Sequence, residues 1–483
     1  MKPATAERLR AALPAGSVLT EREDLKPYEC DGLSAYRETP LAAVLPSDEA
    51  QVAAILKVAR ETKTPVVARG SGTGLSGGAL PLADGILMSM AKFNRMIDMN
   101  ATSRLARVQP GVTNLRISQH VGGLGLYYAP DPSSQIACSI GGNVAENSGG
   151  VHCLKYGLTV HNVARVRAMT IEGEVVELGA EGLDAPGYDL LALAHGSEGL
   201  LAITLEITVK LLPKPEAAQV VMASFRDVES AGEAVANVIG AGIVPAGLEM
   251  MDKLATRAVE DFVHAGYDLE AEAILLAESD GTREDVEHET AKMIEVMRAS
   301  GATDIRISQS DAERLRFWSG RKAAFPAVGR ISPDYYCIDG SIPRGALARV
   351  LKRTGEFCER YSLRCANVFH AGDGNLHPLI LYDANVPGEL ERTEKFAADL
   401  LELCIEMGGT ITGEHGVGIE KINQMCSQFR PAELAQFRAI KAAFDPEGLL
   451  NPGKMVPTLH RCAEYGAMRV KGGALPHPDL PRF

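Results

Sequence analysis

Apolar residues recur along the chain with periods that distinguish helices from strands. Between Asp48 and Thr62 they follow the 3.6-residue repeat of a helix with one buried face, and residues 65–68 then form a short strand pattern before a glycine-rich loop. Further strands are expected at 163–169, 174–178, 202–211, 220–225 and 273–278, and further helices at 230–239, 284–299 and 431–443. This mixture of elements predicts an α+β fold.

The chain is long enough for several domains, because its 483 residues exceed the usual size of one hydrophobic core. Pro213 and Pro215 interrupt both helix and strand, so a domain boundary is expected there. The predicted organisation is an N-terminal segment at 1–38, a first domain at 39–217, a second domain at 218–456 and a surface tail rich in glycine and proline at 457–483.

Composition and charge exclude several classes of protein. The 62 acidic and 49 basic residues give a net charge of −13, which argues against a nucleic-acid-binding surface or a polybasic membrane anchor. No apolar run approaches the roughly 20 residues that a membrane-spanning helix needs. The nine cysteines are scattered without a C-x-x-C pair. They predict free thiols in a cytoplasmic protein, with no iron–sulfur cluster.

Two glycine-rich segments indicate a ligand with phosphates. Five glycines fall between Gly70 and Gly78, directly after the predicted strand, and a second cluster spans residues 139–150. Glycine allows consecutive backbone N–H groups to converge on phosphate oxygens. The first loop lacks both the G-x-G-x-x-G spacing and the lysine of a nucleoside-triphosphate loop. A flexible surface loop is the alternative for one segment alone, but two such loops suit an extended diphosphate better.

A second group of residues has the composition of a metal or catalytic site. His370 and His377 flank a glycine-rich turn, and Glu414-His415 follows about forty residues later. Two imidazoles and a carboxylate are a common ligand set for a divalent cation, although packed or surface histidines are the alternative. Arg321 lies in a basic segment at 316–322, and its planar guanidinium can pair with a carboxylate. A solvated helix face is the alternative for Arg316 and Lys322.

The glycine segments, with Pro130-Asp131-Pro132 and His195-Gly196-Ser197-Glu198-Gly199, resemble the vanillyl-alcohol-oxidase or PCMH flavoprotein superfamily. This resemblance implies a PCMH-type FAD-binding domain followed by an FAD-linked oxidase C-terminal domain. It implies FAD contacts at Arg69, Gly70, Ser71, Gly72, Thr73, Gly74, Leu75, Pro130, Asp131, Ser139, Gly142, Asn143, Ser148, Gly149, Gly196, Glu198, Gly199, Ile203, Glu414 and Asn451. Members with covalent FAD carry a histidine before the loop, where this chain has Arg69, so non-covalent FAD is expected.

The histidine motifs resemble the FAD-linked 2-hydroxy-acid dehydrogenase branch, which includes D-lactate dehydrogenases, D-2-hydroxyglutarate dehydrogenase and glycolate oxidases. The resemblance implies His370, His377 and Glu414 as ligands of a divalent metal such as Zn or Mn. It implies His415 as the catalytic base and Arg321 as the substrate-carboxylate residue. Two positions depart from relatives: Leu379 replaces an asparagine, and Cys337 stands where a dicarboxylate enzyme uses lysine.

The expected reaction is oxidation of a small 2-hydroxy acid, glycolate to glyoxylate, with hydride transfer to FAD. D-lactate oxidation on the same scaffold stays open, as do a metal-dependent hydrolase and a non-catalytic flavin-binding subunit. The chain has no recognisable nicotinamide motif, so reduced FAD is expected to pass its electrons either to oxygen or to a separate protein. The resemblance implies a second flavoprotein-like subunit and an iron–sulfur subunit, which would provide an indirect route to the inner face of the membrane.

Overall fold

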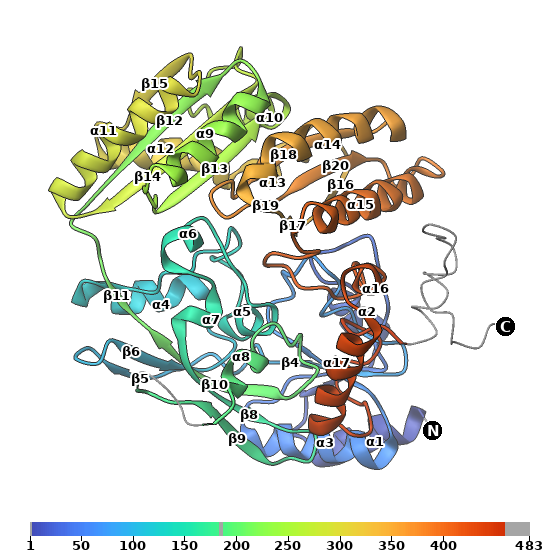
Figure 1. The fold of residues 1–483 in the computed structure, drawn as a ribbon. Helices are drawn as coiled ribbons and strands as arrows, with labels where there is room; N and C mark the ends of the chain where they lie inside the picture. The colour runs from blue at the N-terminus through green and yellow to red at the C-terminus, as the bar shows by residue number, and fades with distance from the viewer. Residues whose placement is uncertain (1, 183–186, 459–483) are drawn as a thin grey trace. The chain divides into compact units, whose positions relative to one another are not determined.

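The computed structural model describes residues 2–182 and 187–458, which form two compact units (Figure 1). Within the described residues, unit 1 consists of 2–149, 158–182, 187–213 and 414–458, and unit 2 of 150–157 and 214–413. The chain passes from unit 1 to unit 2 after Pro213 and returns to unit 1 after Gly413, so residues 414–456, which the sequence analysis assigned to the second domain, belong to unit 1. The predicted tail at 457–483 lies almost entirely outside the described residues.

Unit 1 contains two larger sheets and one small sheet. In the four-stranded sheet the order is β1-β2-β4-β3, with β2, β4 and β3 parallel, and in the antiparallel five-stranded sheet it is β5-β6-β10-β8-β9. The strands are β1 (Val18–Leu19), β2 (Ala42–Val44), β3 (Val66–Arg69), β4 (Ile86–Ser89), β5 (Met96–Asn100), β6 (Leu105–Val108), β7 (Leu126–Tyr127), β8 (Val163–Met169), β9 (Val175–Gly179), β10 (Ile203–Lys210) and β11 (Leu212–Pro213). The helices are α1 (Lys2–Ala12), α2 (Arg22–Leu25), α3 (Glu49–Thr62), α4 (Asn114–Val121), α5 (Ile140–Glu146), α7 (Thr159–Asn162), α8 (Leu190–Ala194), α16 (Met425–Gln428) and α17 (Pro431–Phe444).

Unit 2 is built on one seven-stranded antiparallel sheet of order β15-β12-β14-β13-β18-β20-β16, beside a small β17-β19 pair. Its strands are β12 (Ala217–Phe225), β13 (Gly247–Asp252), β14 (Ala273–Gly281), β15 (Asp304–Ile307), β16 (Asp334–Cys337), β17 (Gly340–Ser341), β18 (Arg364–Phe369), β19 (Asn375–Leu376) and β20 (Pro378–Tyr382). Its helices are α6 (Cys153–Tyr156), α9 (Val228–Gly240), α10 (Lys253–Val263), α11 (Arg283–Ala299), α12 (Asp311–Lys322), α13 (Ala324–Val328), α14 (Leu347–Tyr361) and α15 (Glu389–Glu406). The helices α11, α9, α14 and α15 contact one another in that order, whereas α10 contacts α12 and α13.

The elements expected from hydrophobic periodicity are confirmed within a few residues. The helix after Asp48 is α3, whose buried face consists of Val52, Ile55, Leu56, Val58 and Ala59. Asp48 begins it by accepting a hydrogen bond from the Gln51 N–H at 2.9 Å, as an N-cap residue does. This buried face packs in the core that also contains the apolar side chains of the four-stranded sheet.

Seven cysteines in the described residues are free thiols, whereas Cys426 is disulfide-bonded. This bond corrects the expectation of free thiols throughout, which rested on the absence of closely spaced cysteine pairs. In residues 2–182 and 187–458, no helix is both long and apolar enough to span a bilayer.

Asp252 is the last residue of β13 and the N-cap of α10, and its carboxylate is also hydrogen-bonded to Asn367 of β18. It accepts hydrogen bonds from the Ala255 N–H at 2.8 Å and from the Asn367 N–H and Nδ2 at 2.9 and 2.7 Å. Burial raises the pKa of Asp252 to about 6, because the loss of hydration outweighs these hydrogen bonds.

This raised pKa predicts a pH-dependent stability. An acid whose pKa rises on folding keeps its proton in the folded protein after the unfolded chain has lost it, so its stabilising effect is complete below the unfolded value of 3.8 and is lost as the pH rises through about 6. Relative to Asp252→Asn, the free energy of unfolding of the wild type should fall by up to about 3 kcal/mol between about pH 4 and pH 7. Urea unfolding of both proteins measures this difference, and a constant difference over that range would contradict the assignment.

Candidate active site

The first glycine loop begins where β3 ends, and the side chain of Arg69 supports it from within unit 1. The Arg69 Nη1 donates to the backbone oxygens of Cys30 at 2.6 Å and Tyr28 at 3.5 Å. Burial lowers the pKa of Arg69, while Asp31 and other nearby groups oppose this shift. Gly72 has a φ of +70°, and a Cβ there would lie 2.2 Å from the Arg69 Nη2. A glycine is therefore required where the loop passes over the guanidinium.

The second glycine segment lies directly against the first. Ser139 caps α5 by accepting a hydrogen bond from the Gly142 N–H at 3.3 Å. A Cβ on Gly70 would lie 2.1 Å from the Ser139 Oγ. The Asn114 Nδ2 donates to the Oδ1 of Asn143 in α5 and to the Pro130 backbone oxygen, both at 3.0 Å. The segments at 69–75, 130–131 and 139–143, which the sequence placed on one cofactor, therefore meet in unit 1.

The turn at 195–199 closes onto the other end of α5. The Gly196 N–H donates to the Val144 oxygen at 2.9 Å, and the Glu198 N–H donates to the Ala145 oxygen at 2.8 Å. The Glu198 carboxylate in turn accepts hydrogen bonds from the N–H groups of Val417 at 2.7 Å and Gly418 at 2.8 Å. Glu198 thus anchors the backbone just after His415. Ile203 begins β10 with its side chain in the core.

Asn451 and Lys454 tie these loops together. The Asn451 Nδ2 donates to the backbone oxygens of Gly78 at 2.9 Å and Glu198 at 2.6 Å, while its Oδ1 accepts from the Lys454 Nζ at 2.7 Å. The Lys454 Nζ also donates to the oxygens of Gly78 and Leu80. Burial lowers the pKa of Lys454 to about 8. Both the Nδ2 and the Oδ1 of Asn451 thus have hydrogen-bond partners within the protein, although the family resemblance placed this residue toward the flavin.

Glu146 is a further acidic residue of unit 1 that the sequence reasoning missed. A Cβ on Gly78 would lie 2.7 Å from its Oε1, and a Cβ on Gly416 would lie 2.0 Å from its Oε2. Burial, followed by the nearby Glu198 carboxylate, raises the pKa of Glu146 well above its usual value. This carboxyl therefore binds a proton more readily than an exposed glutamate does.

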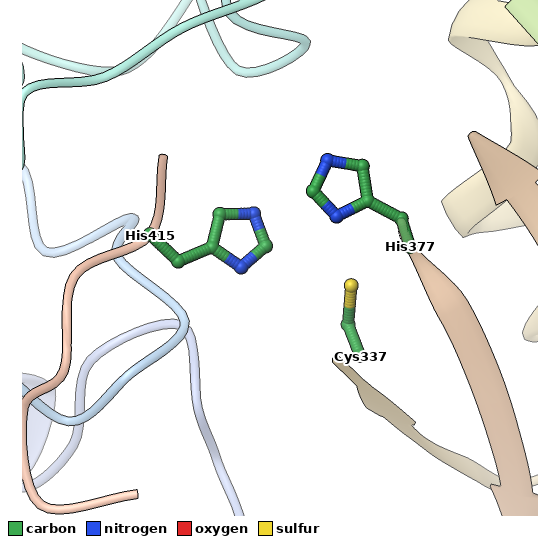
Figure 2. Close-up of side chains that lie close together, drawn as sticks. All are labelled: Cys337, His377 and His415. Carbon is green, nitrogen blue, oxygen red and sulfur yellow. The ribbon is translucent and has the colours of Figure 1, made fainter. Parts of the chain in front are cut away.

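In unit 2 a tight turn brings the two predicted histidines together. His370 and Asn375 exchange backbone hydrogen bonds of 3.1 and 3.2 Å. A Cβ on Gly374, whose φ is +76°, would lie 2.1 Å from the Ile342 oxygen. The rings of His370 and His377 are consequently 5.0 Å apart between centroids, at an interplanar angle of 85°. Figure 2 shows Cys337 beside His377, with their ligand atoms within 4.8 Å of each other.

The sequence reasoning also missed Glu249, a residue of β13 with 1% of its surface exposed. Its Oε1 lies 2.8 Å from the His370 Nδ1, and its Oε2 accepts a hydrogen bond from the Arg321 Nε at 2.7 Å. Burial would raise the pKa of the Glu249 carboxyl, but the charges and hydrogen bonds of His370 and Arg321 hold that pKa below its usual value. A single glutamate within an apolar strand, Gly247–Asp252, was the available signal, because charged residues are almost never buried without partners.

Arg321 lies near the end of α12, where the packing around the helix buries its charge. A Cβ on Gly320 would lie 2.3 Å from the Tyr267 Oη, so the glycine lets that ring approach the helix. The Nη1 and Nη2 of Arg321 are buried and have no hydrogen-bond partner among the described residues. A buried guanidinium with two unused donor groups can bind a carboxylate at both nitrogens.

The remaining predicted residues lie on either side of the last crossing between the units. Gly413 ends unit 2, and its N–H donates to the backbone oxygen and Oδ2 of Asp339, both at 3.1 Å. A Cβ on Gly413 would lie 2.4 Å from the Asn375 side chain. Glu414 and His415 follow as the first residues of the returning segment of unit 1. His415, drawn in Figure 2, therefore belongs to unit 1.

Comparison with known proteins defines the class of this molecule as an FAD-linked oxidoreductase with a PCMH-type fold. The fold resembles the solved structure of p-cresol methylhydroxylase with a TM-score of 0.80 and 18% identity, covering 95% of this chain and 97% of that chain. Residues 40–179 match the model of an FAD binding domain, and residues 214–455 match that of FAD linked oxidases, C-terminal domain. The chain belongs to the FAD-linked oxidase family.

Three curated relatives show how closely the chain resembles members of this family. It is 62% identical over 475 residues to glycolate oxidase subunit GlcD of Escherichia coli, covering 98% of this chain and 95% of the relative. It is 37% identical over 429 residues to the protein of the same name in Bacillus subtilis, covering 89% and 91%. It is 31% identical over 463 residues to a D-lactate dehydrogenase of Anaerostipes hadrus, covering 94% and 97%. The expected fold class, the FAD cofactor and the enzyme class are confirmed.

The packing of Gly70 against Ser139 predicts that a single methyl group weakens FAD binding. Gly70→Ala must displace the Ser139 Oγ or move the loop, and overpacking of this kind costs about 1–3 kcal/mol. We expect roughly 5- to 150-fold weaker FAD binding, measured by titrating apoprotein with FAD. The matched control is Gly123→Ala, because a Cβ there meets nothing within 4 Å. Equal affinity in the two variants would show that the contact between the loops is unimportant for FAD.

Proposed function

We propose that this chain oxidises a small 2-hydroxy acid, glycolate to glyoxylate, and transfers hydride to FAD. The observation that carries the proposal is the buried Arg321, whose Nη1 and Nη2 have no partner among the described residues. Its Nε donates to Glu249, which also contacts His370. A monocarboxylate fits two such donors. The 62% identity to a protein named glycolate oxidase subunit supports the choice of substrate.

The mechanism assigns one task to each residue. Arg321 holds the substrate carboxylate and so fixes the direction of the α-C–H bond, which is a large part of catalysis by orientation. His415 accepts the hydroxyl proton as the general base. Glu198 holds the N–H groups of Val417 and Gly418, so the backbone that carries His415 is anchored in unit 1. When bound, FAD supplies the acceptor for the hydride.

The histidine pair has the donor set of a divalent metal site such as Zn or Mn. The Nδ1 of His370 lies near Glu249, and that of His377 lies 3.3 Å from the Ile338 oxygen, so we propose the Nε2 atoms as the ligand atoms of the two histidines. We propose Glu414 as the third ligand. Its neighbour Gly413 packs against Asn375 in the histidine turn. Because consecutive Cα atoms are only about 3.8 Å apart, this packing keeps the Glu414 backbone close to that turn. The ion would polarise the substrate's hydroxyl and carboxylate.

The proposed FAD contacts are those of the sequence analysis, with two distinctions. Arg69, Glu198 and Asn451 act by holding the loops, because their side chains already bond to the protein. Gly70, Gly142, Asn143 and Gly196 belong to the segments that meet at α5. FAD is proposed to be non-covalent, because the residue before Gly70 is the buried Arg69 and no histidine occurs from 69 to 78.

Cys337 and Leu379 favour a small monocarboxylic substrate. They are directly opposite each other in the pairing of β16 with β20, and both are buried. Opposite residues of an antiparallel pair project to the same face. Neither side chain offers the cation that a second carboxylate would need. D-lactate, which adds only a methyl group to glycolate, remains the second candidate, and the D-lactate dehydrogenase relative supports it.

The electrons are proposed to leave through partner subunits, a second flavoprotein-like chain and an iron–sulfur chain, which would connect this protein indirectly to the membrane. The support is that two relatives are named as subunits of an oxidase. The segment before Thr39 and the tail after Met455 are the proposed docking regions, with ordinary chain ends as the alternative.

The test of function is anaerobic reduction of the bound FAD. Glycolate should bleach the visible absorption of the flavin in a single turnover, because FAD accepts the hydride. D-lactate should bleach it more slowly. Arg321→Lys loses bidentate pairing, so its KM should rise roughly 10- to 150-fold, the equivalent of one charged hydrogen bond. Arg316→Lys, on the exposed face of α12, is the control. A wild-type flavin that neither acid bleaches would refute the proposed function.

Substitution of His415 should slow flavin reduction, whereas substitution of His377 should remove the metal. His415→Ala should retain FAD and metal but reduce its flavin about 10²- to 10⁴-fold more slowly, as loss of a general base does. His377→Ala should instead lose metal, measured by elemental analysis of the purified protein. His120→Ala, on an exposed position of α4, is the control for histidine loss. Active wild-type protein without stoichiometric metal would remove the ligand assignment and leave the histidines as direct substrate contacts.

A further inference from the structure

We propose that Glu249 is a positioning residue that fixes the direction of Arg321 and the tautomer of His370 at the same time. This inference rests on the proposed function, because it explains how that site is held ready for its substrate and metal. The two carboxylate oxygens of Glu249 are divided between the two partners: Oε2 contacts the Arg321 Nε at 2.7 Å and Oε1 contacts the His370 Nδ1 at 2.8 Å.

The register of the sheet places Glu249 where it can reach His370. Strands β13 and β18 are antiparallel, with Met250 opposite Phe369 and Met251 opposite Val368. One further step in the same register places Glu249 opposite His370, the residue that follows β18. Cross-strand neighbours have Cβ atoms about 4.5–5.5 Å apart, which suits a direct contact between a carboxylate and an imidazole. The contact therefore follows from strand pairing and does not depend on a mobile loop.

The contact with Arg321 determines which part of the guanidinium is available. Glu249 takes the Nε, and the Nη1 and Nη2 remain buried without a partner among the described residues. The carboxylate neutralises the arginine and makes its burial tolerable before substrate arrives. The opposite end of the planar fork is left to receive a second carboxylate.

The contact with His370 determines which ring nitrogen can bind a metal. An ionised carboxylate can only accept hydrogen bonds, so the Nδ1 of His370 must carry the proton. The Nε2 of the same neutral ring then carries the lone pair that a metal ion requires. A carboxylate behind a ligating histidine typically changes metal affinity by about 10- to 100-fold when it is removed.

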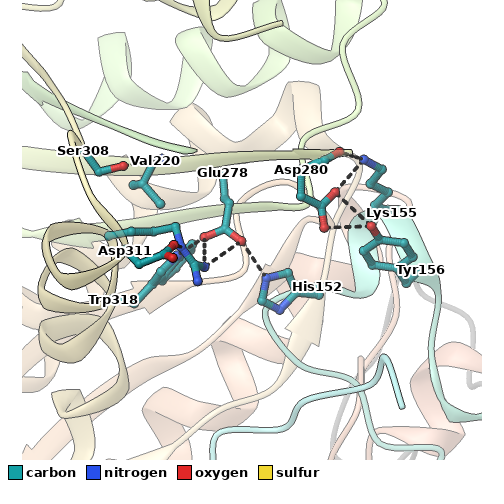
Figure 3. Close-up of polar contacts among 10 residues, drawn as sticks. His152, Lys155, Tyr156, Val220, Glu278, Asp280, Ser308, Asp311 and Trp318 are labelled. Carbon is teal, nitrogen blue, oxygen red and sulfur yellow. Dashed lines mark hydrogen bonds and ion pairs between the residues drawn. The ribbon is translucent and has the colours of Figure 1, made fainter. Parts of the chain in front are cut away.

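The chain contains a matched control for this residue. Glu278 lies on the neighbouring strand β14 and is also buried. Figure 3 shows its carboxylate beside Trp318 and His152: it accepts a hydrogen bond from the Trp318 Nε1, and the His152 Nε2 lies 3.3 Å away. The carboxylate also accepts a hydrogen bond from the Arg314 Nη1 at 3.2 Å. Glu278 thus also joins an arginine and a histidine, but these are not the proposed ligand and substrate residues. Glu278→Gln reproduces the loss of a buried carboxylate without touching Arg321 or His370.

The decisive variant is Glu249→Gln, because Arg321 and His370 contact different oxygens of the carboxylate and the amide replaces one of these acceptors with an NH₂ donor. The tautomer is measured by ¹⁵N NMR of histidine-labelled protein after chelation of metal, with His370→Gln to assign the signal. Wild type should show a protonated Nδ1 on His370, and Glu249→Gln should shift the proton toward Nε2. Titration with Zn²⁺ should then show about 10- to 100-fold weaker binding in Glu249→Gln and wild-type affinity in Glu278→Gln.

Steady-state kinetics separate positioning from a general loss of stability. At saturating Zn²⁺, Glu249→Gln should still have a higher KM for glycolate than the wild type. The guanidinium of Arg321 loses its orientation whether or not the metal is bound. Thermal unfolding should place Glu278→Gln at least as low in stability as Glu249→Gln. An unchanged His370 tautomer and unchanged Zn²⁺ affinity in a folded Glu249→Gln would overturn the inference.

Two further outcomes keep this inference distinct from the proposed function. If Glu249→Gln does not fold, the wild-type spectrum alone decides, because a proton on the Nε2 of His370 would overturn the inference. If the tautomer shifts as expected but neither glycolate nor D-lactate reduces the wild-type flavin, the proposed function fails and the positioning role of Glu249 stands.

Discussion

A charged side chain that is removed from water must find a charged or hydrogen-bonding partner, and the Glu249–Arg321 pair meets this constraint for unit 2. Each residue has 1% of its surface exposed, and the nitrogen-to-oxygen distance between them is 2.7 Å. An uncompensated charge at this depth would cost several kcal/mol. Strand β13, helix α12 and the turn after β18 must therefore keep their relative places, because each contributes one member of the Glu249, Arg321 and His370 group.

The same constraint organises unit 1 around its glycine loops. Glycines allow the loops to approach one another closely, but the close approach leaves backbone oxygens that need donors. Asn451 and Lys454 supply them at Gly78, and Glu198 supplies the matching acceptor for Val417 and Gly418. The segment with Asn451 and Lys454, near the end of the family match, thus holds loops that are far away in sequence by hydrogen bonds. The shape of the glycine-loop region therefore depends on buried polar contacts.

The sequence predicted the elements and the motif-bearing turns because both depend on local order. The helix after Asp48, the glycine loops and the turn between His370 and His377 all have a period or a spacing that can be read directly. Glu249 could not be assigned in this way, since its two partners lie 72 and 121 residues away along the chain. The return of the chain to unit 1 after Gly413 could not be assigned either. A division of the sequence into consecutive ranges cannot describe a segment that packs back into an earlier unit.

The two buried glutamates of the central sheet differ in how much hydrogen-bonding capacity their arginine partners retain. Glu249 and Glu278 lie on neighbouring strands, and each joins an arginine to a histidine. Arg314 also donates from its Nε to Asp311 at 3.3 Å, so its charge is shared between two acidic residues. Arg321 has the same kind of first partner but keeps two buried donor groups unused. Burial and pairing are common to both sites, so the proposal of an anionic ligand at Arg321 rests on the hydrogen-bonding capacity that this guanidinium leaves unused among the described residues.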